Sequence, residues 1–138
     1  MSTQESLQVV KEGYAAFGRG DIAGLLALMA DDVEWTSPGA GLPLSGTYRG
    51  VEGVANFFQK LAAEVEMLDF QPREFVADRD RVLVLGSQSA KIRATNRVVN
   101  LEWAMSFTVR GGKISNFREY ADTKAIAEAY QSAAGASA

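Results

Sequence analysis

The spacing of apolar residues changes once along this chain, near Met67, and this change limits the folds that the chain can adopt. Before Met67, apolar side chains recur every three or four residues, as they do on one face of a helix. After it, they alternate with polar side chains, as in strands that bury one face. The order of helices first and strands second predicts an α+β domain in which helices cover one face of a curled sheet.

Helices are expected over residues 2–17, 22–29 and 51–65, where the apolar spacing is helical. Ser2 and Glu5 have capping-box spacing at the start of the first helix, and Asp21 can cap the second. A short strand is expected over residues 33–36. The following loop, up to Gly46, holds two of the three prolines and is interpreted as a rim or lid.

Four further strands are expected over residues 70–77, 81–91, 98–109 and 114–121. Their connections are short, so the strands should pair antiparallel. A last short helix should begin at Asp122 or Thr123 and end near Tyr130. We expect residues 1–130 to form a single domain and residues 131–138 to form a frayed tail.

The chain contains no cysteine and no histidine, which restricts its chemistry. Disulfides, thiolate nucleophiles, Cys/His zinc sites and Ser-His-Asp relays are excluded. An enzyme with this sequence would use Asp, Glu, Tyr, Lys or a bound cofactor for proton transfer.

The charge pattern and the absence of long apolar runs restrict the partners. Seventeen acidic and fourteen basic residues give a net charge of −3 without a clustered basic stripe, so nucleic acid is not an expected partner. No apolar run approaches the roughly 20 residues that span a bilayer, and the first ten residues do not resemble a signal peptide. We therefore expect a cytoplasmic protein that does not bind membranes.

Several motifs resemble those of SnoaL-like proteins, which belong to the nuclear transport factor 2-like (NTF2-like) superfamily. They are YAAFGRGD at 14–21, ADDVEW at 30–35, GTYRGVEG at 46–53, and GKI with EYADT at 112–123. The resemblance covers residues 7–130. It implies a cystatin-like cone, in which three N-terminal helices pack on a curved, mixed but mainly antiparallel sheet that encloses a pocket. The superfamily includes ketosteroid isomerases, polyketide cyclases, dehydratases and epoxide hydrolases, and also proteins that bind ligands without chemistry.

The sequence departs from the ketosteroid isomerase pattern at the positions that carry its chemistry. Where that enzyme has its basic aspartate, directly before a proline, this chain has Ser37 before Pro38. Its oxyanion-hole tyrosine aligns with Gly13, one position before Tyr14. Many SnoaL-like chains also have a histidine where this chain has Met105. Steroid isomerisation by the usual residues is therefore disfavoured.

Three residues are candidates for acid-base catalysis. The resemblance places the aspartate of polyketide cyclases on Asp122, although an aspartate at that junction also serves as a helix cap. Glu119 shares a strand face with Phe117, where a carboxylate is costly unless it is paired or functional. Its structural alternative is an ion pair with Arg93. Tyr14 is a candidate hydrogen-bond donor, although its place on the apolar stripe of the first helix favours a plain core position.

Large apolar residues on the expected inner faces are candidates for the wall of a binding site, although such residues also form ordinary cores. They are Trp35, Phe58, Trp103, Met105, Phe107 and Phe117. The acidic residues at 31–34 are interpreted as a solvated turn rather than a metal site. Gly111 and Gly112 are interpreted as a hairpin turn rather than a nucleotide site.

These observations favour a small-molecule enzyme without metal or organic cofactor. It would act as an isomerase, cyclase, dehydratase or hydrolase on an apolar substrate in an internal cavity, by carboxylate acid-base catalysis. The alternative is a protein of the same fold that binds an apolar ligand without chemistry, or a dimerising accessory protein. A homodimer is expected in either case, because related cones commonly pair through the outer face of the sheet.

Overall fold

Helix α3 ends at Glu64 and strand β3 begins at Val65. The switch from helix to strand thus lies within two residues of Met67, where the spacing of apolar residues changes. The computed structural model describes residues 2–131, and the expected frayed tail lies outside these residues except for Gln131. In chain order the elements are α1 (Thr3–Gly18), α2 (Ile22–Leu26), β1 (Met29–Ser37), β2 (Gly46–Arg49), α3 (Gly50–Glu64), β3 (Val65–Asp78), β4 (Arg81–Ile92), β5 (Arg97–Arg110), β6 (Lys113–Ala121) and α4 (Thr123–Ala129).

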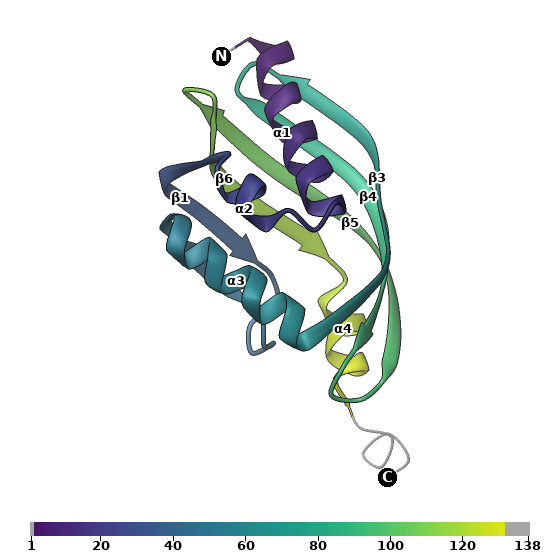
Figure 1. Ribbon diagram of the computed structural model, residues 1–138. Helices are drawn as coiled ribbons and strands as arrows, with labels where there is room; N and C mark the ends of the chain where they lie inside the picture. The colour runs from purple at the N-terminus through teal and green to yellow at the C-terminus, as the bar shows by residue number, and fades with distance from the viewer. Residues whose placement is uncertain (1, 132–138) are drawn as a thin grey trace.

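The six strands form one curved sheet with the order β2-β1-β6-β5-β4-β3. Helices α1, α2 and α3 lie over its concave face, and α4 lies at one end of the sheet (Figure 1). Helix α1 contacts β3, β4, β5 and β6, whereas α3 lies mainly against β1 and β2. The predicted α+β class is therefore confirmed. Within residues 2–131, no helix has the length and apolar character needed to cross a membrane.

Side-chain caps fix the starts of α1 and α2, as the sequence predicts. At the start of α1, the Ser2 hydroxyl accepts from the Glu5 amide, and the Glu5 carboxylate accepts from the Ser2 amide. Asp21 accepts from the Gly24 amide at the start of α2. Each cap satisfies amides that the helix itself leaves without a partner.

The four C-terminal strands pair antiparallel in chain order, as expected, but β1 lies parallel to β6. The expected helix up to Met29 is shorter in the structure, because Met29 already belongs to β1. The Ile114 amide donates to the Leu28 carbonyl at 2.8 Å, and Met29 pairs with Ile114. Pairing with a strand more than 80 residues later thus overrides the local helical pattern.

Strand β2 is absent from the sequence-based expectation. It has only four residues and pairs antiparallel with β1 at the edge of the sheet, where the hydroxyls of Thr36 and Thr47 lie 3.1 Å apart. Such a short strand carries no alternation that could be recognised in the sequence.

The sheet curves toward the helices, and two bulges in β3 and a glycine in β4 lie in its curved part. Strand β3 changes register between Met67 and Asp69 and again between Pro72 and Glu74, and such bulges bend a strand. In β4, a Cβ atom at Gly86 would lie 2.5 Å from carbons of the Trp103 ring and 2.5 Å from the Gln71 carbonyl oxygen. The missing side chain therefore lets the indole lie directly on the backbone of β4.

Candidate functional site

A cavity of about 140 Å³ lies between the concave face of the sheet and the helices. Five of the six predicted wall residues line it: Trp35, Phe58, Met105, Phe107 and Phe117. Trp35 is 6% exposed and stacks on Phe117 with ring centroids 3.7 Å apart. The sixth predicted residue, Trp103, is buried beside the cavity rather than in its wall, stacked against Tyr14 and Phe70.

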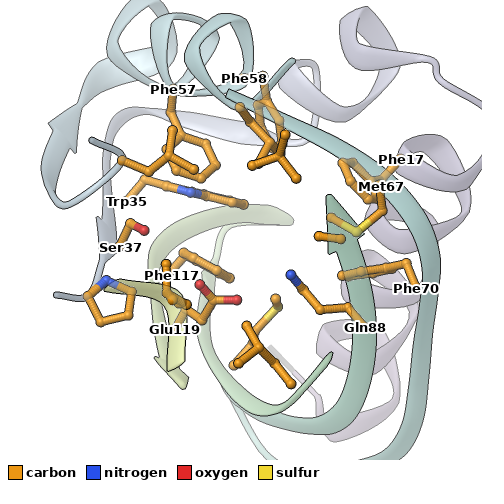
Figure 2. Close-up of a pocket in the computed structure, with 18 of the residues that line it drawn as sticks. Phe17, Trp35, Ser37, Phe57, Phe58, Met67, Phe70, Gln88, Phe117 and Glu119 are labelled. Atoms are coloured by element: carbon orange, nitrogen blue, oxygen red, sulfur yellow. The ribbon is translucent and has the colours of Figure 1, made fainter. Parts of the chain in front are cut away.

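Glu119 places a carboxyl group in this apolar cavity. It lies on β6, pairs with Met105 of β5, and points into the space between Ser37 and Gln88 (Figure 2). No residue in 2–131 donates a hydrogen bond or gives an ion pair to its carboxyl group. Burial away from water disfavours the charged form and raises the pKa of Glu119 from 4.5 to about 7.

The predicted structural alternative for Glu119, an ion pair with Arg93, is not formed. The Arg93 guanidinium instead donates to the Ala62 carbonyl at 3.0 Å, at the end of α3. Glu119 is therefore the one acidic side chain in the lining, and its charge has no counterion among the described residues.

Tyr14 reaches the cavity from α1, where its ring packs edge-on against Phe107. Its hydroxyl donates to the Met105 sulfur at 3.1 Å. Burial, and secondarily the negative charge of Glu119, raise the pKa of Tyr14 far above its ordinary value. The phenol consequently keeps its proton at neutral pH and can act only as a donor toward the carboxylate.

Besides Tyr130, whose hydroxyl donates to Glu64, two polar residues of the cavity were not predicted as site residues. Gln88 lines the cavity from β4, and Ser37, which is 8% exposed, lines it from the end of β1. The parallel register pairs Trp35 with Phe117 and Thr36 with Arg118, so the next pair along brings Ser37 beside Glu119. The sequence did hold a signal for Gln88, because an amide interrupts the alternating residues Val82, Val84, Gly86, Gln88, Ala90 and Ile92.

Residues 10–117 match the sequence model of the SnoaL-like domain. The chain belongs to the SnoaL-like family. This match covers most of the chain and confirms the resemblance that the motifs indicate.

Similar proteins support the same assignment over almost the full length. An NTF2-like protein from Burkholderia xenovorans LB400 is 46% identical, with 95% of this chain and 99% of that chain covered and a TM-score of 0.87. TerC, co-crystallised with polyporic acid, is 31% identical, with 93% and 99% covered and a TM-score of 0.82. An uncharacterised protein of Mycobacterium tuberculosis is 29% identical over 130 residues, which are 94% of this chain and 98% of that protein.

In this SnoaL-like chain, Asp122 has a position that differs from that of Glu119. It is exposed, it does not line the cavity, and its carboxylate accepts from the Ala125 amide at 3.1 Å as the cap of α4. The structure therefore brings Glu119 and Tyr14 together at the cavity and leaves Asp122 outside it.

Two of the three acidic residues near the start of β1 form ion pairs with arginines. Asp32 pairs with Arg110 at 2.8 Å, and Glu34 pairs with Arg49. Within the described part of this SnoaL-like chain, no three acidic side chains gather in a way that could hold a metal ion. The chemistry available to the cavity residues themselves is proton transfer by one carboxyl group, next to neutral hydrogen-bonding groups.

Proposed function

We propose that this SnoaL-like protein binds a small apolar molecule in the cavity and moves a proton on it, with Glu119 as the acid or base. The observation that carries this proposal is the carboxyl group of Glu119, which faces an apolar cavity without a hydrogen-bonding or charged partner from residues 2–131. A carboxyl group of this kind can serve as acid or base in reactions of the isomerase, cyclase, dehydratase and hydrolase types.

The pKa of Glu119 suits this role. A general acid or base works best when its pKa lies near the pH at which it operates, and a value of about 7 keeps both forms populated near neutrality. Tyr14 is proposed as a neutral donor that gives up its hydrogen bond to the weakly accepting Met105 sulfur and holds the reacting group instead. We do not include Asp122 in the mechanism, because its carboxylate caps α4 outside the cavity.

Two comparisons support a ligand-binding cavity. The SnoaL-like family match covers the residues that build most of the cavity wall, and the 31% identical TerC was co-crystallised with a small molecule, polyporic acid. They are equally compatible with the second candidate function, which is binding without chemistry. The specific observation favouring that candidate is that Asp122, the position that matches the cyclase acid, lies outside the cavity.

Hydrogen-deuterium exchange into a ketone distinguishes the two functions without knowledge of the natural substrate. The protein is incubated in D₂O with 2-tetralone, a two-ring ketone with acidic protons beside its carbonyl, and exchange is followed by NMR. A catalytic Glu119 should raise the exchange rate above that of buffer, and the rate should increase as the pH rises through about 7, because the base must be ionised.

Two variants serve as controls for this exchange. Glu119→Gln should lose the catalysed exchange, whereas Asp122→Asn, which keeps a capping oxygen, should retain it. Exchange at the buffer rate with the native protein would favour binding without chemistry.

We also propose that two copies of the chain pair through the outer face of the sheet. Exposed apolar side chains gather there: Val76 is 59% exposed beside Leu83, and Tyr120 is 54% exposed in the same band as Leu85. Such exposed apolar bands are typical of interaction surfaces. A location in the cytoplasm stays a prediction from the sequence.

A further inference from the structure

We propose that Gln88 binds an oxygen atom of the ligand, so that the cavity selects uncharged molecules that carry a ketone or hydroxyl group on an apolar body. This inference rests on the proposed function only in taking the cavity as the ligand site. It holds whether or not Glu119 transfers a proton.

The position of Gln88 requires an explanation, because an amide lies on an otherwise apolar strand face. Its neighbours in the register are Phe70 of β3 and Leu101 of β5. Along β4, the residues on the same face are Gly86 and Ala90, which have no polar side-chain atoms. Gln88 is half-buried and its amide atoms are not fully buried, so water or a ligand in the cavity can reach them.

No described residue supplies a hydrogen-bond partner for this amide. Within residues 2–131, neither the oxygen nor the nitrogen of the Gln88 side chain takes part in a protein hydrogen bond. The tyrosine hydroxyls of the cavity are already engaged, since Tyr14 donates to Met105 and Tyr130 donates to Glu64 at 3.0 Å. The Gln88 amide is therefore left to interact with whatever fills the cavity.

The direction of the side chain agrees with this role. Figure 2 shows the Gln88 amide extending from β4 into the cavity, where it points toward the carboxyl group of Glu119. A ligand between them can place its oxygen at Gln88 and the neighbouring atoms at Glu119. If Glu119 removes a proton beside a carbonyl, the negative charge develops on the oxygen that the Gln88 N–H binds, where a fixed donor stabilises it.

The charge of the lining determines the class of ligand. The lining contains no lysine or arginine, and its one carboxyl group has the sign that repels anions. A carboxylate or phosphate would lose its water in an apolar cavity without gaining a counterion. Gln88 offers a neutral N–H donor and a neutral carbonyl acceptor, which suit a ketone oxygen and a hydroxyl group respectively.

Three ligands of nearly equal shape test this inference. Binding of tetralin, 2-tetralone and tetralin-2-carboxylate is measured by calorimetry at about pH 5.5, where Glu119 is mostly protonated. We expect the ketone to bind about tenfold more tightly than the hydrocarbon, as one good hydrogen bond provides. The carboxylate should bind more weakly than both.

The variant Gln88→Leu has similar volume and no hydrogen-bonding group. It should lose the preference for the ketone while it retains or improves the affinity for tetralin. Gln88→Met, whose side chain is unbranched like that of glutamine, provides a second variant if leucine perturbs folding. Thermal unfolding reports whether each variant is folded. An unchanged ketone preference in either folded variant would overturn the inference. Two results with the native protein would also overturn it: no preference for the ketone over the hydrocarbon, or equal affinity for the carboxylate and the ketone.

The variant Glu119→Gln separates this inference from the proposed catalysis. It should keep the preference for 2-tetralone over tetralin while it loses deuterium exchange. A loss of exchange with retained preference supports both proposals. Retained preference in a native protein without catalysed exchange supports Gln88 alone.

Discussion

Met105 and Glu119 are paired directly across strands β5 and β6, and both side chains line the cavity. The Met105 sulfur accepts the hydrogen bond of Tyr14, so this hydroxyl is not bonded to the nearby carboxyl group. Many SnoaL-like chains are expected to have histidine at this strand position. With methionine there instead, a weak acceptor holds the phenol, so no hydrogen bond from Tyr14 offsets the burial that raises the pKa of Glu119.

Replacement of Met105 by leucine should therefore lower the pKa of Glu119. The change nearly conserves volume and removes the sulfur acceptor, which leaves the Tyr14 hydroxyl available to donate to the ionised carboxylate. Carbon-13 NMR of labelled glutamate would report the titration of Glu119 in the native protein and in Met105→Leu. The double variant Tyr14→Phe with Met105→Leu lacks the donor and should not show the decrease. Equal values in the native protein and the single variant would refute this account.

The raised pKa of Glu119 should make the stability of the fold depend on pH. Between pH 4.5 and about 7 the folded state holds a proton that the unfolded state has lost, so the free energy of unfolding decreases as the pH rises through this range. The difference between the two values corresponds to about 3 kcal/mol as an upper figure. Urea unfolding measures this free energy at several pH values. It should decrease with pH more in the native protein than in Glu119→Gln, which has no carboxyl group at this position. A difference between the two proteins that does not vary from pH 4.5 to 8 would contradict it.

Gly86→Ala should destabilise the fold by about 1–3 kcal/mol, because the new methyl group would overlap the Trp103 ring and the Gln71 carbonyl. Gly18→Ala is the matched control, since a Cβ atom there has no neighbour within 4 Å. Urea unfolding of both variants measures the effect. Equal stabilities would mean that the indole does not rest on β4.

Asp122→Ala should cost about 1 kcal/mol of stability, because the Ala125 amide loses its capping oxygen. Asp122→Asn should cost much less. Thermal unfolding compares the two. If both variants unfold like the native protein, the side chain has no capping role and its candidacy in catalysis would have to be reconsidered.

A charge in the outer apolar band should prevent pairing of two copies. Leu83→Lys and Leu85→Lys place an ammonium group among the exposed residues of this band, and neither residue lines the cavity. Analytical ultracentrifugation at micromolar concentration should show a dimer for the native chain and a monomer for the variants. A native monomer would refute the proposed pairing.

The parts of the fold that depend on local pattern could be predicted from the sequence. The change of period near Met67, the caps at Ser2 and Asp21 and the inner face of β5 all follow from spacing and side-chain chemistry. The end of α2 could not be predicted, because β6 pairs with Met29 from far along the chain. Gln88 was overlooked because the interruption of the apolar alternation in β4 gains its meaning only when the neighbours of Gln88 across the sheet are known.

The parallel pairing of β1 with β6 has a consequence for how the protein acquires its site. Between them lie more than 70 residues, and β1 has only the short β2 as a partner until β6 arrives. Contacts of such long sequence separation form slowly. During synthesis, the wall that joins Trp35 to Phe117 cannot close until β6 has left the ribosome, so a ligand meets a finished cavity only after that strand has paired with β1.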